Sequence, residues 1–155
     1  MAALRRLLPQ LTHLRHASGA TRVSLSVVGQ TPPKVIEHTV RLTAIDLMDG
    51  QRYSLRGLLG EKLVRSLKRS KLIEEEAHMI EDLSACDGVC EISVAGEWLE
   101  KLPPRSEEEE AMLKKSAIKG QDVDIHSRLA CQIVLEKKLD GMAFAVPEPK
   151  PWRTN

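Results

Sequence analysis

Alternating hydrophobic and polar positions between residues 38 and 58 predict two strands joined by a turn. The first strand is predicted from His38 to Leu47, with a half-buried face at Val40, Leu42, Ala44 (or Ile45) and Leu47. The dipeptide Asp49-Gly50 follows, which is typical of a tight hairpin turn. The returning strand is predicted from Arg52 to Leu58.

A helical period replaces this alternation after residue 60. A helix is predicted from Gly60 to Lys71, with an apolar face at Leu63, Val64, Leu67 and Leu72. Its outer face carries the cations Arg65, Lys68 and Arg69. Strand, turn, strand and helix are therefore the predicted opening of the fold.

The middle of the chain predicts a loop, a short strand and a second helix. Residues 74–90 form the loop-like segment, and Cys90 to Val94 fits the short strand. Ser106 is a preferred N-cap for the helix that follows, and Glu109 stands where a capping box needs a carboxylate. We expect the run from Glu107 to Glu110 to be a solvated first turn that the helix dipole favours.

The C-terminal third predicts two more strands. They run from Leu129 to Leu135 and from Met142 to Val146, and Asp140-Gly141 joins them. Trp98, which precedes this region, is expected in the core.

Composition narrows the class of protein. A length of 155 residues fits one domain plus a tail, and a hydrophobic fraction of 42% supports a packed core. The net charge of +1 and the aromatic fraction of 3% argue against a nucleic-acid-binding protein. No apolar run is long enough to span a membrane. The 3 cysteines exclude a fully paired disulfide framework.

The N-terminal segment has the composition of a mitochondrial transit peptide. Residues 1–36 contain neither Asp nor Glu, and leucines recur beside arginines at helical spacing. We predict a transit peptide over residues 1–22, with an ordinary basic helix as the alternative, and a location in the mitochondrial matrix. The predicted domain covers residues 23–148, and the prolines of residues 149–155 predict an extended tail.

The cysteines Cys86, Cys90 and Cys131 allow two interpretations. They are either buried core thiols or ligands of a soft metal, for which Cys and His commonly complete four positions. A thiol-redox centre at Cys86 and Cys90 is less favoured, because their spacing is not C-x-x-C. No nucleophile with a base and an orienting group is evident, so we do not expect an enzyme.

A series of motifs then occurs in a fixed order along the chain. They are Met48-Asp49-Gly50, Leu58 to Leu63, Ala85 to Gly88, Glu100 to Leu102, Ser106 to Leu113, Ser127 to Ile133 and Met142 to Glu148. Together they resemble the adrenodoxin-type mitochondrial ferredoxins over about residues 35 to 148, nearly the whole predicted domain. The resemblance implies an α+β fold, a single β-grasp domain of the 2Fe–2S ferredoxin type, that passes single electrons.

The same resemblance implies four cysteine ligands, of which this chain has only three. The family's cluster loop is C-x5-C-x2-C, and Cys90 takes its third position. Strict counting then puts Asp87 and Glu81 at the other two positions. A two-residue deletion instead puts Cys86 at the first position and leaves the second without a ligand. In both alignments one thiolate is missing.

We therefore predict a single Fe or Zn ion held by Cys86, Cys90, Cys131 and His78, in place of a complete 2Fe–2S cluster. Asp87 and Glu81 are the alternatives to His78 as the fourth ligand. The alternative role for His78 is that of an ordinary surface histidine.

The positions that dock redox partners in the family are also altered. Acidic residues flank the Met112-Leu113 pair there, whereas this chain has Ala111 and Lys114. The chain also resembles the degenerate ferredoxin-like subunits of plant-type mitochondrial complex I. We therefore predict an accessory subunit, peripheral to the inner membrane on its matrix side, that bridges the matrix arm and the carbonic-anhydrase-like module. The alternative is a functional 2Fe–2S electron carrier for iron–sulfur assembly or a cytochrome P450.

Overall fold

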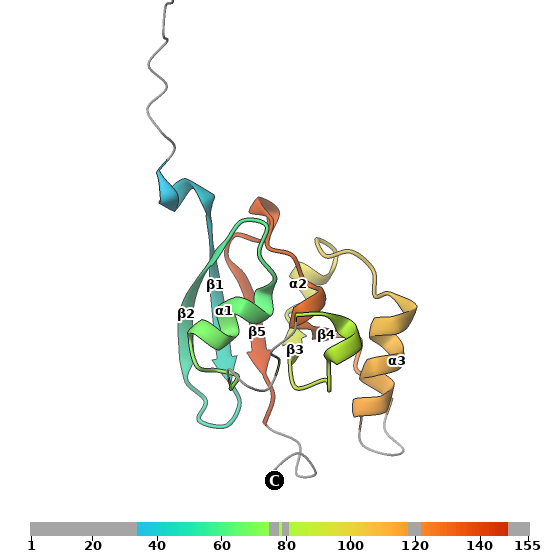
Figure 1. The fold of residues 1–155 in the computed structure, drawn as a ribbon. Helices are drawn as coiled ribbons and strands as arrows, with labels where there is room; N and C mark the ends of the chain where they lie inside the picture. Colours follow the sequence, from blue (N-terminus) through green and yellow to red (C-terminus); the bar gives the residue numbers. More distant parts are fainter. Residues whose placement is uncertain (1–33, 75–77, 79–80, 118–121, 149–155) are drawn as a thin grey trace, which may run out of the picture. The chain divides into compact units, whose positions relative to one another are not determined.

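The computed structural model describes residues 34–74, 78, 81–117 and 122–148, drawn in colour in Figure 1. These residues lie within one compact unit of the chain. Its helices and strands are, in order, η1 (Val35–His38), β1 (Thr39–Asp46), β2 (Arg52–Leu58), α1 (Leu63–Arg69), η3 (Leu83–Ala85), β3 (Glu91–Val94), α2 (Gly96–Leu99), α3 (Glu107–Ser116), β4 (Ser127–Leu129), η4 (Ala130–Gln132), η5 (Lys137–Leu139) and β5 (Met142–Val146).

The strands form one mixed sheet in the order β2-β1-β5-β3-β4. β1 pairs antiparallel with β2 on one side and parallel with β5 on the other. β3 pairs antiparallel with both β5 and β4. A parallel pair made by the first and last strands, with a helix packed across the sheet, is the β-grasp arrangement that the sequence analysis predicts.

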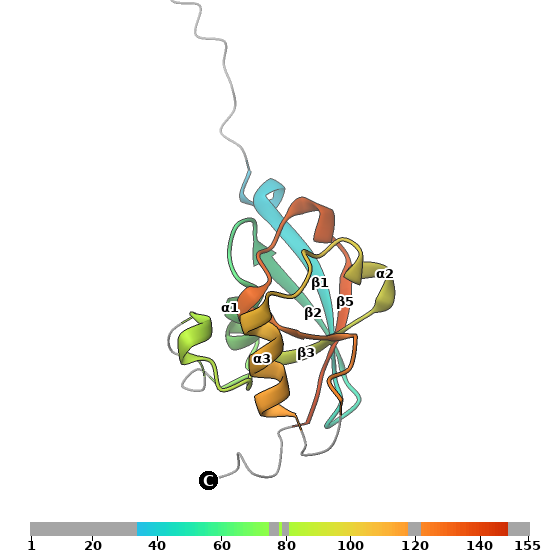
Figure 2. The same cartoon turned by 90° about the vertical axis from the view of Figure 1, so that its right-hand side faces the viewer.

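The core lies between the sheet and α1. Val40, Leu42 and Ala44 of β1 are buried together with Leu63 and Leu67 of α1. Burying one large aliphatic side chain contributes about 1.5–3 kcal/mol, so this layer is a major contribution to the stability of the domain. Figure 2 shows α1 and α3 on one side of the sheet and the short α2 on the other.

The first hairpin is longer than the Asp49-Gly50 dipeptide suggests. The backbone N–H of Asp46 donates to the carbonyl of Gln51 at 2.9 Å, so the loop that this bond closes contains residues 47–50. Gly50 adopts a φ of 69°, a backbone conformation that favours glycine. Leu47 lies in this connection and is 51% exposed, so its predicted place on the buried face is wrong.

The predicted strand over residues 129–135 is also wrong. Only Ser127–Leu129 forms β4, and the chain then tightens into η4. Residues 133–135 pair instead with the segment before α1, where Gly60 N–H donates to the carbonyl of Leu135 and Leu63 N–H to that of Ile133, each at 2.8 Å. This pairing also explains why α1 begins at Leu63 and not at Gly60.

The sequence analysis predicts that Asp140-Gly141 joins two strands. In the structure, β5 does not pair with β4, the strand that precedes it in the chain. It lies between β1 and β3. Asp140 is held by Arg41 of β1, whose backbone N–H and guanidinium both donate to the carboxylate, at 2.8 and 2.9 Å. Local sequence could not anticipate this pairing because it joins opposite ends of the domain.

Two sequence predictions fall outside the described residues. They are the transit peptide over residues 1–22 and the tail over residues 149–155, and the domain boundaries stay predictions. Among the described residues, no helix is both long and apolar enough to cross a bilayer. Trp98 is 9% exposed, which agrees with its predicted place in the core.

Candidate metal centre

The β3–β4 ladder brings two of the three cysteines together. Its antiparallel register pairs Glu91 with Leu129, so Cys90, which precedes Glu91, comes opposite Ala130, which follows Leu129. The carbonyl of Cys90 accepts a hydrogen bond from Ala130 N–H at 2.9 Å, next to Cys131. Residues 41 positions apart in the sequence therefore meet because a buried sheet places them, which gives this half of the site a rigid base.

A tight turn brings the third cysteine to the same place. Gly88 adopts a φ of 74° between Cys86 and Cys90, and its N–H donates to the Cys86 sulfur at 3.3 Å. The Sγ atoms of Cys86 and Cys90 lie 3.5 Å apart. Gln132 likewise directs its side-chain amide at the Cys131 sulfur, at 3.4 Å. Such N–H groups stabilise thiolates and orient them as ligands.

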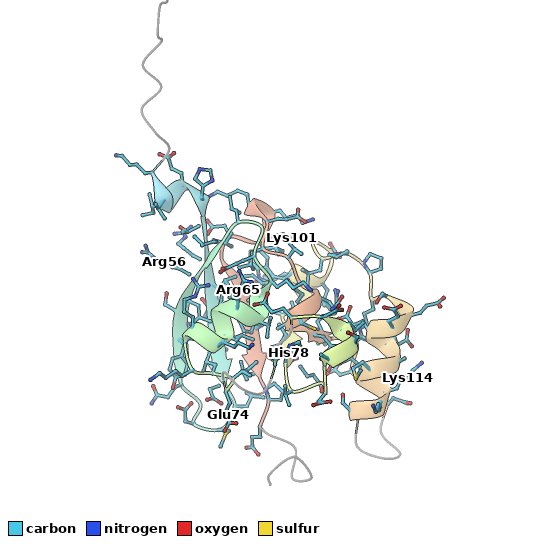
Figure 3. All side chains as sticks on the ribbon, viewed as in Figure 1. Arg56, Arg65, Glu74, His78, Lys101 and Lys114 are labelled. Carbon is cyan, nitrogen blue, oxygen red and sulfur yellow. The ribbon has the colours of Figure 1, made fainter. Side chains whose placement is uncertain are left out.

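His78 enters the site from the segment between α1 and η3 (Figure 3). The ammonium of Lys68 on α1 donates to the main-chain carbonyl of His78. His78 is only 1% exposed, so the alternative of a surface histidine is wrong. Both of its ring nitrogens are buried without a hydrogen-bond partner of ordinary geometry among the described residues. Since a buried polar atom without a partner is costly, this arrangement calls for a ligand.

The four predicted donor residues converge on one point. The imidazole of His78 and the sulfurs of Cys86, Cys90 and Cys131 offer ligand atoms that all lie within 4.8 Å of one another. All four residues are buried. Three thiols and one imidazole form a donor set suited to zinc or iron. That these residues bind a metal stays a prediction.

The neighbours within this group shift the pKa values of its members. Interaction with the thiols of Cys131 and Cys86 raises the pKa of His78 to about 10. Hydrogen bonds from Cys86 and Cys90 lower the pKa of the Cys131 thiol. The adjacent thiols, Cys131 first, raise the pKa of Cys90, because a second thiolate beside the first is unfavourable. The protonated His78 therefore offsets part of the thiolate charge, and a bound metal ion would replace that proton.

The two alternative fourth ligands do not join this group. Asp87 is exposed on the turn between the cysteines. The Glu81 carboxylate accepts two hydrogen bonds from Arg65 on α1, at 2.8 and 3.0 Å, and this pairing lowers its pKa. The structure therefore brings His78, and neither carboxylate, to the three sulfurs.

A second buried group next to the site was not anticipated. Glu109, expected on a solvated turn, is 1% exposed and binds the guanidinium of Arg128 at 2.9 Å. Its carboxylate also accepts the N–H of Leu129 at 2.9 Å. Ser106 caps the helix as predicted, because its hydroxyl accepts the Glu109 N–H at 3.0 Å. The Glu109 carboxylate does not complete a capping box with Ser106, since it binds Arg128 instead. No local pattern distinguishes Glu109 from its exposed neighbours.

Known proteins with similar sequences are ferredoxins. No family model matches the chain. It is 34% identical over 112 residues to Ferredoxin-2, mitochondrial, of Xenopus laevis, covering 72% of this chain and 54% of that one. It is 29% identical over 121 residues to Adrenodoxin-like protein 1, mitochondrial, of Drosophila melanogaster, covering 75% and 63%. The chain thus spans between half and two thirds of the length of these relatives.

Solved structures agree with the fold. A ferredoxin from Rhodopseudomonas palustris HaA2 superposes with a TM-score of 0.61 at 25% identity, over 71% of this chain and 98% of that one. Oxidized putidaredoxin gives a TM-score of 0.59 at 25% identity, over 70% and 96%. Fold and site together define a protein of the 2Fe–2S ferredoxin fold with a buried group of three cysteines and one histidine. Within that class, the chain is similar in sequence to the mitochondrial ferredoxins named above, at 34% and 29% identity.

Proposed function

We propose that this chain is a mitochondrial ferredoxin-like metalloprotein, and not itself an enzyme, whose centre is a single Fe or Zn ion bound by Cys86, Cys90, Cys131 and His78. The proposal is supported by the short distances within the site, where the four ligand atoms all lie within 4.8 Å of one another. Around one tetrahedral ion, sulfurs bound at about 2.3 Å lie roughly 3.8 Å apart. The separation of 3.5 Å between Cys86 and Cys90 is close to that value.

A 2Fe–2S cluster fits these residues less well. Thiolates on opposite irons are separated by the whole Fe2S2 unit, which requires roughly 5.5 Å or more between their sulfurs. Every pair in this site is closer than that. The cluster also takes four cysteines in proteins of this type, and the chain has only 3.

The second candidate is a 2Fe–2S electron carrier, and the comparisons favour it over a respiratory-complex subunit. The relatives and solved structures named above are ferredoxins, and none of them is named as a complex I subunit. This candidate requires the loop from Cys86 to Cys90 to open and His78 or another donor to replace the missing thiolate. Iron–sulfur assembly and a cytochrome P450 are the acceptors we predict for it.

The bridge within complex I remains our proposal for the cellular role of a single-ion protein. It is supported by the missing thiolate and by the altered face of α3. Lys114 forms an ion pair with Glu110 of the same helix at 2.7 Å, which weakens the negative field that a transient electron carrier would use to dock. We propose a position on the matrix side of the inner membrane, between the matrix arm and the carbonic-anhydrase-like module.

Metal and acid-labile sulfide analysis of the purified chain tests the centre. We expect one Fe or Zn per chain and no labile sulfide, and a lower melting temperature after chelation, because metal binding and folding are linked. Cys131→Ser should abolish binding, whereas Asp87→Asn, a matched change at the exposed alternative ligand, should preserve it. Two irons and two sulfides per chain would overturn the single ion in favour of the electron carrier.

Native electrophoresis of gently solubilised mitochondrial membranes tests the bridge separately. The chain should comigrate with complex I. Recovery only as a small soluble species that a ferredoxin reductase reduces would refute the bridge, whatever metal the centre holds.

A further inference from the structure

The segment that carries His78 is attached to one face of α1 by cations spaced three residues apart. Arg65 and Lys68 share this face, since residues three apart are neighbours on a helix, and Lys62 is the residue directly before the helix. The ammonium of Lys62 donates to the main-chain carbonyl of Glu81, and that of Lys68 to the carbonyl of His78. Arg65 binds the Glu81 carboxylate through two hydrogen bonds.

These contacts hold His78 and Glu81 against α1 and the residue before it. In Figure 3, Arg65 lies on α1 and His78 on the segment that follows the helix. Arg69 differs, although it stands on the same helix. It pairs at 2.5 Å with Glu61, which precedes α1 and does not belong to the segment.

The two halves of the donor set are therefore positioned by different means. Hydrogen bonds within the sheet and the turn fix Cys90, Cys131 and Cys86. His78 is not part of the sheet, and its main-chain carbonyl accepts a hydrogen bond from the ammonium of Lys68. Its imidazole is nevertheless completely buried against the sulfurs.

We infer that Lys68 and Arg65 are positioning residues that hold His78 in place as the fourth ligand. This inference rests on the proposed single-ion centre and deepens it. A donor fixed in advance binds more tightly, because less conformational freedom is lost when the metal arrives. Removing groups that orient a ligand typically costs 10- to 100-fold in metal affinity.

The test compares full-length Lys68→Gln and Arg65→Gln/Lys68→Gln with the wild type. Zinc affinity is measured by chelator competition, and the visible spectrum of the Co(II)-substituted protein reports the ligand set. We expect roughly 10- to 100-fold weaker zinc binding and a change of the Co(II) spectrum toward that of His78→Ala. Arg69→Gln, which removes the same charge from the same helix, should leave both unchanged, and Lys68→Arg should restore them.

A double-mutant cycle separates positioning from general stability. In a His78→Ala background, Arg65→Gln/Lys68→Gln should change zinc affinity by less than about threefold, because the ligand through which they act is gone. An equal loss in both backgrounds, or no loss in the wild-type background, overturns the inference. Failure of the wild type to bind one Co(II) with thiolate charge-transfer bands overturns the proposed centre itself, and the inference with it. The two failures are thus distinguishable.

Discussion

The ion pair between Glu109 and Arg128 gives the sharpest prediction about stability. Their side chains are 2% and 4% exposed, so neither charge is solvated when its partner is lost. Arg128 donates two hydrogen bonds to the carboxylate and a third, at 2.9 Å, to the carbonyl of Pro103. Removing one partner of such a pair costs about 3–5 kcal/mol, because the other charge stays buried.

Glu109→Gln and Glu109→Ala separate the loss of the ion pair with Arg128 from the loss of the hydrogen bond to Leu129. Gln keeps the volume and an oxygen that accepts the N–H of Leu129, whereas Ala also leaves that N–H without its partner. We expect a loss of about 3 kcal/mol for Gln and about 1 kcal/mol more for Ala. Glu107→Gln, at an exposed position in the same turn, should cost less than about 1 kcal/mol.

Urea unfolding followed by circular dichroism, at equal metal loading, measures these changes. Combining Glu109→Gln with Arg128→Met should lose about 2 kcal/mol less than the sum of the single losses, because no unpaired charge remains. A loss below about 1 kcal/mol for Glu109→Gln, or strict additivity in the double variant, would refute the argument.

Two further predictions concern the sheet. Gly57→Ala places a Cβ 2.0 Å from Cδ1 of Leu135 and 2.8 Å from Oγ of Ser66, so we expect a loss of about 1–3 kcal/mol by urea unfolding, against less than about 1 kcal/mol for Gly96→Ala. Arg41 lowers the pKa of Asp140 from 3.8 to about 2, so the carboxylate stabilises the fold fully above pH 3.8 and loses that effect as the pH falls through about 2. In Asp140→Asn, the free energy of unfolding measured between pH 2 and pH 4 should therefore depend less on pH than in the wild type. An unchanged pH dependence would contradict the stabilising role of the Asp140 carboxylate.

The sequence predicts the elements that depend on local pattern. β2 has the predicted bounds, and β1 keeps its buried face at Val40, Leu42 and Ala44 because alternate residues of a strand share a face. The predicted apolar face of α1 is buried at Leu63, Val64 and Leu67. Where the prediction failed, distant contacts decide: η4 replaces a strand at Cys131, whose neighbour Ala130 bonds to the carbonyl of Cys90.

The four residues of the candidate site could be predicted from the sequence, but the contacts that hold them in place could not. The cysteine spacing leaves core thiols and metal ligands equally open, and it is the resemblance to the ferredoxins that nominates Cys86, Cys90, Cys131 and His78. The burial of Glu109 could not be predicted, because its partner Arg128 stands 19 positions further along the chain. The contact between Lys68 and the main chain of His78 could not be predicted either, because the cations of α1 have the sequence pattern of an ordinary solvated helix face.

The four residues of the candidate site are held by different parts of the fold, so one thiolate can be absent without a change in the sheet. Cys90 and Cys131 are fixed by the β3–β4 ladder, which the fold needs in any case. The other donors come from a tight turn and from a segment that side chains of α1 hold, and neither contributes to the sheet. Sequence change in these two places alters the number and kind of ligands while leaving the core intact. We therefore propose that the turn at Gly88 and the His78 segment determine how many metal ions the site holds, whereas the β-grasp sheet itself favours neither number.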